Sequence, residues 1–156
     1  MLTDMDHLFT APISELAPAA PISVTAGTSV GDAIALMQKH RIGCILVTQG
    51  GRLAGILTDR DVTMKVAGRP VEMSVPVEDL MTVDPETLSP DHEIAYALNR
   101  MSLGGYRHVP LVDGDGTPRG VISVKDVVNH IVEHFPQTVY NLPPEPDVIS
   151  RSREGA

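Results

Sequence analysis

The chain contains the stretch GILTDRD at residues 55–61 and a related stretch, GVISVKD, at residues 120–126. In each, an apolar run that begins with glycine ends in a hydroxyl residue, and an aspartate follows three positions later. The hydroxyl residues are Thr58 and Ser123, and the aspartates are Asp61 and Asp126. Hydroxyl side chains favour helix N-caps, and the i, i+3 spacing puts both groups on one face. We therefore expect each stretch to lead a β-strand directly into a helix.

The two stretches belong to an internal repeat that covers most of the chain. Residues 13–16 (ISEL) match residues 77–80 (VEDL) at an offset of 64, and one inserted residue near Gly104-Gly105 changes the offset to 65. Proline, glycine and aspartate stay in step with the apolar pattern in both copies. The matched pairs include Pro21 with Pro85, Ala33 with Ala97, Met37 with Met101, Gly51 with Gly116 and Asp61 with Asp126.

Each copy predicts the same order of elements, β-α-β-β-α. A short extended piece (22–24 or 86–88) precedes a helix, which is entered by Thr28 or Ser29 in the first copy and by Asp91 in the second. A hairpin follows, with strands at 44–47 and 53–57 or at 109–112 and 120–122, and then a second helix near 59–67 or 124–134.

One copy is too small to bury both faces of its own sheet. We therefore predict an α/β (α+β) fold in which two pseudo-symmetric βαββα repeats pack sheet to sheet. The predicted segments are an N-terminal extension (1–12), two repeats (13–70 and 77–134) and a Pro-rich tail (135–156). Proline opposes helix and sheet, so the tail is expected to be extended, either disordered or docked through Phe135, Val139, Tyr140 and Leu142.

Composition narrows the class of protein. A length of 156 residues suits one compact unit, since domains usually run ~100–200 residues. The formal charge of −8, the absence of Trp and the scarcity of Phe and Tyr are unfavourable for nucleic-acid binding. Cys44 is the only cysteine, which excludes an intramolecular disulfide and a multi-cysteine metal site. No apolar run reaches ~18 residues and no signal peptide is evident, so we expect a cytoplasmic protein without membrane contact.

The two hairpin sequences, IGCILV with GILTDRD and RHVPLV with GVISVKD, resemble the CBS domain. The tandem arrangement resembles a CBS pair, or Bateman module, of the standalone bacterial type, and the resemblance covers about residues 13–130. It implies βαββα units, often a homodimer that forms a disc of four repeats, and clefts between paired units that bind adenosine compounds. The implied ligands are AMP, ADP, ATP, S-adenosylmethionine and NADH.

The resemblance implies that two hydroxyl–aspartate pairs, Thr58 with Asp61 and Ser123 with Asp126, bind ribose. The chemistry is reasonable, because a carboxylate can accept from both hydroxyls of a vicinal diol. Each hydrogen bond to a charged acceptor contributes ~1.5–3 kcal/mol, and a helix N-terminus offers free N–H groups. The alternative is that these residues only cap their helices.

Phosphate requires positive charge, which an acidic chain must provide locally. In the family, basic residues beside the first hairpin strand often have this role. The predicted phosphate-binding residues are Arg107, His108, Lys125 and Arg41, and the predicted adenine contacts are Pro21, Ile22, Pro85 and Val109. The first copy has Gly43-Cys44 where the second has His108-Val109, so we expect its cleft to be poorer in charge and to take a less phosphorylated ligand or none.

No catalytic motif is evident, neither GxSxG, P-loop, HExxH nor a dinucleotide fingerprint, so we predict that the protein is not an enzyme. His130 and His134 have a spacing that could share zinc, but no further ligand is evident and we predict no metal site. Two functions remain. One is an energy-sensing regulatory module that binds an adenine nucleotide and controls a separate, unidentified protein. The other is a ligand-free scaffold for dimerisation.

Overall fold

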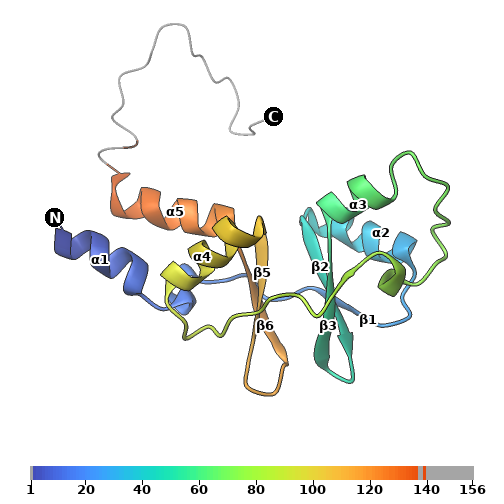
Figure 1. Ribbon diagram of the computed structural model, residues 1–156, viewed down its shortest axis with the longest axis horizontal. Helices are drawn as coiled ribbons and strands as arrows, with labels where there is room; N and C mark the ends of the chain where they lie inside the picture. Colours follow the sequence, from blue (N-terminus) through green and yellow to red (C-terminus); the bar gives the residue numbers. More distant parts are fainter. Residues whose placement is uncertain (1, 137–138, 140–156) are drawn as a thin grey trace, which may run out of the picture.

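The computed structural model describes residues 2–136 and 139, and it consists of two similar halves (Figure 1). From the N-terminus, the elements are α1 (Leu2–Thr10), η1 (Ile13–Leu16), β1 (Ser23–Thr25), α2 (Val30–His40), β2 (Cys44–Gln49), β3 (Arg52–Thr58), α3 (Asp59–Lys65), η2 (Val77–Asp79), β4 (Thr82–Val83), α4 (Ile94–Gly104), β5 (His108–Val112), β6 (Pro118–Ser123) and α5 (Val124–His134), where η denotes a 3-10 helix. The prediction for the Pro-rich tail lies almost entirely outside the described residues.

Each half is built on an antiparallel hairpin, β2–β3 in the first and β5–β6 in the second. A parallel segment lies along the first strand of each hairpin: β1 pairs with β2, and Leu88 forms a bridge with Leu111. The hairpins stand next to each other in the middle of the molecule, with α2 and α3 beyond one and α4 and α5 beyond the other (Figure 1). The predicted fold of two βαββα repeats packed sheet to sheet is confirmed.

The second edge of each hairpin is covered by the other repeat. β4, which begins the second repeat, pairs antiparallel with β3 of the first. In return, Ala19, from the start of the first repeat, forms an antiparallel bridge with Val121 in β6. An open sheet edge presents unpaired N–H and C=O groups, so this exchange satisfies both hairpins at once.

The two 3-10 helices are exchanged in the same way. Ile13 in η1 is fully buried in the core of the second repeat, among residues such as Ile94 and Leu111. Val77 in η2 is fully buried in the core of the first repeat. The segments 13–16 and 77–80 match each other in sequence, yet each packs against the repeat that it does not belong to in sequence.

A third apolar cluster joins the hairpins at the centre. Cys44 and Leu46 in β2 and Ile56 in β3 are buried together, and Val121 of β6 packs against them. The backbone N–H of Leu53 also donates to the carbonyl of Gly116 across the two halves (2.9 Å). The halves are therefore held together by apolar packing as well as by the exchanged segments.

The helix starts only partly follow the sequence prediction. The Ser29 cap is confirmed, since its side chain accepts from the Asp32 N–H at 3.1 Å. The predicted Asp91 cap is wrong: α4 begins later, with Glu93 at the N-cap position and no side-chain cap. Asp91 instead lies in a turn in which the Ser89 hydroxyl accepts from the Asp91 N–H. α1 was not predicted, and its Leu8 is 2% exposed.

Because Ile13 completes the core of the other repeat, Ile13→Ala is expected to lower the free energy of unfolding by about 2–5 kcal/mol, the usual cost of a buried Ile-to-Ala change. Urea denaturation measures this cost, with exposed Glu15→Ala as the control. A loss below about 1 kcal/mol would mean that η1 is not part of the second repeat's core.

Candidate functional site

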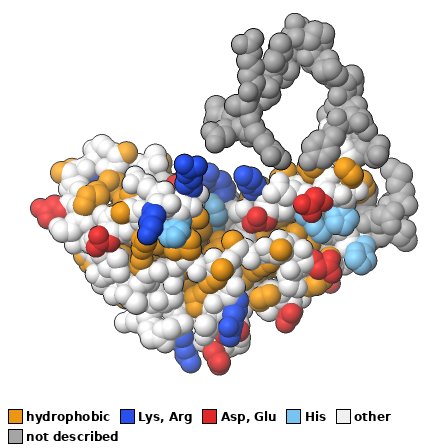
Figure 2. Space-filling view, turned by 180° about the vertical axis from the view of Figure 1, so that it is seen from behind, with side chains coloured by type: hydrophobic (Ala, Val, Ile, Leu, Met, Phe, Trp, Pro, Cys, Tyr) orange, Lys and Arg blue, Asp and Glu red, His pale blue; other side chains and the backbone are white. Residues whose placement is uncertain are grey.

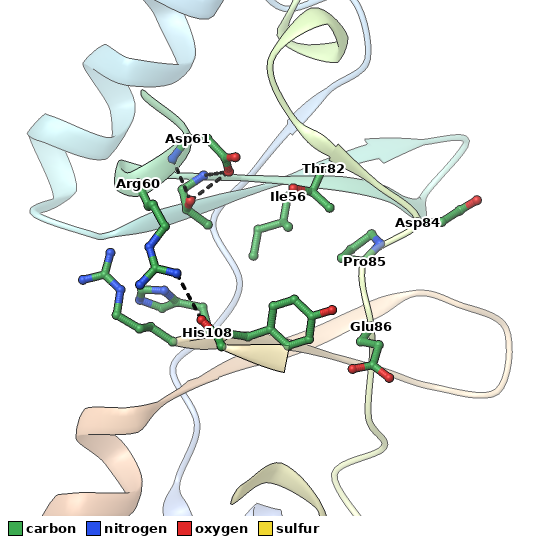
Figure 3. A pocket seen from close by; sticks show the side chains of 12 residues that line it. Ile56, Arg60, Asp61, Thr82, Asp84, Pro85, Glu86 and His108 are labelled. Atoms are coloured by element: carbon green, nitrogen blue, oxygen red, sulfur yellow. Dashed lines mark hydrogen bonds between the residues drawn. The ribbon is translucent and has the colours of Figure 1, made fainter. Parts of the chain in front are cut away.

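Two clefts open between the repeats, and each takes residues from both. The first, cleft A, has a volume of about 250 Å³ and is lined by Ile56, Thr58, Arg60, Asp61, Thr82, Asp84, Pro85, Glu86, Gly105, Tyr106, Arg107 and His108. Figure 3 shows Arg60 and Asp61 entering from α3 on one side and His108 from the opposite hairpin. Asp84, Pro85 and Glu86 approach along the connecting segment that follows β4.

The second, cleft B, has a volume of about 220 Å³ and is lined by Ala19, Ala20, Ile22, Ile42, Cys44, His108, Val121, Ser123 and Asp126. Its hydroxyl–aspartate pair comes from the second repeat, whereas its apolar residues, except Val121, come from the first. His108 lines both clefts and therefore lies between them.

The predicted ribose residues of cleft A form a capping box at the start of α3. One carboxylate oxygen of Asp61 accepts from the backbone N–H (3.0 Å) and the hydroxyl (2.8 Å) of Thr58, and the Thr58 Oγ1 accepts from the Asp61 N–H. The other oxygen lies 2.9 Å from the Lys65 ammonium. Burial alone would raise the pKa of Asp61, but hydrogen bonds from Lys65 and Thr58 outweigh it and lower the pKa. The carboxylate is ionised and fixed in position.

The pair in cleft B repeats this box at the start of α5. One oxygen of Asp126 accepts from the Ser123 N–H and hydroxyl, both at 2.7 Å. The residue that matches Lys65 in this copy is His130, and among the described residues Asp126 has no ion pair. Both hydroxyl–aspartate pairs therefore cap their helices. In the described part of the chain, the second oxygen of Asp126 has no cationic partner.

Basic side chains at cleft A bridge the repeats. Arg107 of the second repeat pairs with Asp59 of the first (2.6 Å), and Arg60 donates to the carbonyl of Gly105 (3.1 Å). Both partners of the ion pair are about half exposed, so it contributes only ~0–1 kcal/mol. The pair can therefore open at little cost. Although the whole chain is acidic, Figure 2 shows Lys and Arg side chains in two places on this face, along its upper middle and at its lower edge.

His108 sits against Gly43, the residue that matches it in the first repeat. A Cβ atom on Gly43 would lie only 3.1 Å from Cε1 of the His108 ring. The pKa of His108 is lowered, chiefly by burial and further by the positive charge of Arg107. The Asp59 and Asp126 carboxylates raise this pKa, but they do not outweigh the burial. The imidazole is therefore neutral near pH 7.

The structure gathers most, but not all, of the residues predicted for ligand binding. Cleft A contains Thr58, Asp61, Arg107, His108 and Pro85, and cleft B contains Ser123, Asp126, His108 and Ile22. Four other predicted residues line neither cleft. Lys125 is exposed, and Arg41 lines a separate hollow between α2 and α3. Pro21 lines neither cleft, and Val109 is buried in the core of the second repeat.

We predicted that the Gly43-Cys44 segment would lie in the same cleft as Thr58 and Asp61 of its own repeat, and this is wrong. Each cleft combines residues of both repeats. This segment faces Ser123 and Asp126 in cleft B, and the Arg107-His108 segment faces Thr58 and Asp61 in cleft A. Sequence reasoning also missed Tyr106 and Ile42. Both residues lie just before the first strand of a hairpin, so the repeat alignment could have indicated them. It does so only if each of these strands is placed in the cleft that holds the other repeat's hydroxyl–aspartate pair.

The remaining candidates lie away from the clefts. His130 and His134 lie at a ring-centroid separation of 4.3 Å, and His130 is buried, with 8% of its surface exposed. Burial lowers the pKa of His130. No group of three or more potential metal ligands is found in the described ranges. Within the same ranges, every helix is too short or too polar to span a bilayer.

Comparison with known proteins agrees with this architecture. The family model described as the CBS domain matches residues 13–68 and 77–133. The chain belongs to the CBS domain family. This CBS pair is similar to the uncharacterized 17.7 kDa protein in the bps2 3′ region of Acidianus ambivalens. The two are 28% identical over 122 residues, and the alignment covers 78% of this chain and 73% of that protein. Several other curated relatives are longer, and the chain spans 17–60% of their length.

Two solved structures show the same fold. The CBS domain protein PAE2072 from Pyrobaculum aerophilum, complexed with AMP, is 23% identical with a TM-score of 0.71, covering 80% of this chain and 98% of that one. The CBS domain pair of protein MJ0100, in complex with 5′-methylthioadenosine and S-adenosyl-L-methionine, is 22% identical with a TM-score of 0.69, covering 78% and 99%. Related CBS pairs thus bind adenosine-type ligands.

Because they form capping boxes, the residues predicted to bind ribose also stabilise the starts of α3 and α5. Asp61→Ala is expected to lower the free energy of unfolding by about 0.5–2 kcal/mol, since Thr58 loses its acceptor at the helix start. Asp61→Asn keeps an acceptor oxygen and should lose less. Urea denaturation of both variants, with exposed Asp115→Ala as the control, measures the difference. Equal stability of the wild type and Asp61→Ala would show that the box contributes nothing.

Proposed function

We propose that this CBS pair is a cytoplasmic regulatory module, not an enzyme, that binds adenine nucleotides of the AMP, ADP and ATP class and controls a separate protein. The observation that carries the proposal is the composition of cleft A. There a fixed carboxylate, Asp61, faces Arg107 and His108 across the boundary between the repeats, and Arg60 adds a further positive charge from its own helix. Ribose and phosphate need these two kinds of group at opposite ends of one cleft.

The carboxylate supplies the ribose end. Asp61 is ionised and its direction is fixed by Thr58, so it can accept from the ribose hydroxyls. Its second oxygen now binds Lys65, whose ammonium also donates to the carbonyl of Leu80. Because Lys65 has this alternative acceptor, the oxygen can accept from a hydroxyl without leaving the ammonium unpaired.

Arginine supplies the phosphate end. A guanidinium presents its donors as a planar fork that suits phosphate oxygens. Arg107 is held by a half-exposed carboxylate, Asp59, and a ligand phosphate would compete with that carboxylate for the same donors. We therefore infer that binding replaces the Arg107–Asp59 ion pair with an Arg107–phosphate pair. A contact between the two repeats is then exchanged for a contact between the second repeat and the ligand.

The relatives support an adenosine ligand. The AMP complex of PAE2072 and the 5′-methylthioadenosine and S-adenosylmethionine complex of MJ0100 have the same fold. The shared part of these ligands is adenosine, which agrees with the ribose candidates in both clefts. We therefore include AMP, ADP, ATP, S-adenosylmethionine and NADH among the candidate ligands.

Regulation would follow from the composite clefts. A ligand in cleft A contacts both repeats, so it favours the arrangement in which Asp61 and Arg107 lie at the right separation. A ligand shifts an equilibrium only by its differential affinity for the two arrangements. Couplings of ~1–3 kcal/mol would change the affinity for a partner about 5–150-fold.

Nucleotide binding is expected to raise the melting temperature. At 100 times the dissociation constant a ligand adds ~2.7 kcal/mol, which corresponds to a shift of several degrees, about 5–10 °C, for a chain of this size. A thermal-shift panel of AMP, ADP, ATP, NADH, S-adenosylmethionine and adenosine measures it. The Asp61→Asn/Asp126→Asn double variant should lose the shift. If no compound acts at millimolar concentration, the sensor is ruled out.

AMP affinity is expected to rise as the pH falls from about 8 to about 6. His108 has a lowered pKa in the free protein, and a nearby phosphate would raise it, so binding takes up a proton. Calorimetry in two buffers of different ionisation enthalpy measures the uptake. Adenosine, which lacks phosphate, and the His108→Asn variant should show less uptake. The same uptake in wild type and His108→Asn would contradict a phosphate contact at His108.

The scaffold remains the second candidate because apolar side chains are exposed on the helices. Met64 in α3 is 69% exposed, Leu103 in α4 is 78% exposed and Val128 in α5 is 49% exposed. We propose that they contribute to a homodimer that forms a disc of four repeats. In the sensor this dimer carries the ligand signal, whereas in the scaffold dimerisation is the whole function. The ligand panel separates the two.

A further inference from the structure

The two clefts are built from matched positions of the two repeats. The offsets of 64 and 65 pair residues of cleft A with residues of cleft B as follows: Ile56 with Val121, Thr58 with Ser123, and Asp61 with Asp126. Both clefts therefore have an apolar strand residue, a helix-capping hydroxyl and a carboxylate at matched positions, and by the proposed function both can hold a nucleoside.

The same pairing shows where the clefts differ. Three charged residues of cleft A are replaced by apolar ones in cleft B: Asp84 by Ala20, Glu86 by Ile22, and Arg107 by Ile42. Cleft A also contains Arg60, whereas the residues described as lining cleft B include neither lysine nor arginine. Cleft B therefore retains the features for ribose and lacks those for phosphate.

The groups around the shared His108 increase this difference. Its ring lies over Gly43, so the first repeat has no side chain of its own at this position. The Asp59 Oδ2 lies 3.6 Å from the same Cβ position, and Asp126 lines the cleft itself. A phosphate in cleft B would face the Asp126 carboxylate and a neutral imidazole, and like charges repel.

We propose that cleft B is a site for an adenine nucleoside whose 5′ group carries no negative charge, while cleft A takes the 5′-phosphate. The proposal rests on the proposed function, since it assumes that the hydroxyl–aspartate pairs bind ribose. Ile22, Ile42 and Cys44 form an apolar wall in cleft B, which suits a hydroxymethyl or thioether group at the 5′ position. One chain would thus sense two ligand classes separately.

Single-cleft variants of the full chain test the proposal. Isothermal titration calorimetry with AMP, adenosine and 5′-methylthioadenosine is run on wild type, Asp61→Asn and Asp126→Asn. In Asp61→Asn, where cleft B remains intact, adenosine and 5′-methylthioadenosine should bind about tenfold or more tighter than AMP. In Asp126→Asn, where cleft A remains intact, AMP should bind about tenfold or more tighter than adenosine, because hydrogen bonds to charged groups are of this magnitude.

A gain-of-function variant adds a positive test. Ile42 matches Arg107, so Ile42→Arg in the Asp61→Asn background places a guanidinium at cleft B and should raise AMP affinity about tenfold or more. Gln49→Arg, at the exposed far end of β2, adds the same charge away from the cleft and serves as the control. An equal gain in both would mean that the effect is one of net charge and not of cleft B.

The outcomes separate this inference from the proposed function. If wild type binds none of the three compounds, both fail. If wild type binds and Asp61→Asn prefers AMP to adenosine, or binds neither nucleoside, cleft B is not a nucleoside site and only the further inference fails. Reversed preferences of the two single variants, with a gain specific to Ile42→Arg, support it.

Discussion

Neither repeat can close its own hairpin, and the rest of the molecule depends on that constraint. The free edge of β3 is completed by β4 from the second repeat, and the edge of β6 by Ala19 from the first. The exchange buries Ile13 and Val77 in the opposite cores. Because the connecting segments cross, each cleft beside them must contain residues of both repeats. Composite clefts are thus a consequence of satisfying sheet edges, and ligand contact with both repeats follows from the same geometry.

The two kinds of contact between the repeats differ in strength. At the centre, Leu46 and Ile56 pack with Val121 away from solvent, and removing such side chains costs several kcal/mol, ~2–5 for Leu to Ala. At the mouth of cleft A the contacts are a half-exposed ion pair and one hydrogen bond from Arg60, and such exposed contacts contribute little each, ~0–1 kcal/mol. A ligand can therefore rearrange the mouth while the centre stays intact, which is what a reversible regulatory module requires.

The sequence was sufficient for the duplication and for the two hairpins with their helices, because apolar periodicity and glycine-rich turns are local signals, but it did not indicate α1. It was insufficient for the exchange. The match between residues 13–16 and 77–80 indicates that the two segments are equivalent, but it does not indicate which core each segment packs into. The residues that line each cleft depend on this packing. Arg41 was misplaced for a related reason. It ends α2 in the left-handed conformation, with a φ of 53°, and it lines the hollow between α2 and α3. Side-chain direction at a helix end depends on backbone geometry that residue type alone does not fix.

The asymmetry of the clefts has a steric origin. His108 and Gly43 occupy matched positions, but the His108 ring takes up space next to Gly43, where even a Cβ atom would be only 3.1 Å away. A side chain at position 43 would compete with the His108 ring for the same space, while the buried cluster of Cys44 and Leu46 holds the hairpins close. The close approach that holds the repeats together thus favours a side chain at only one of the two matched positions, and this makes the linings of the two clefts unequal.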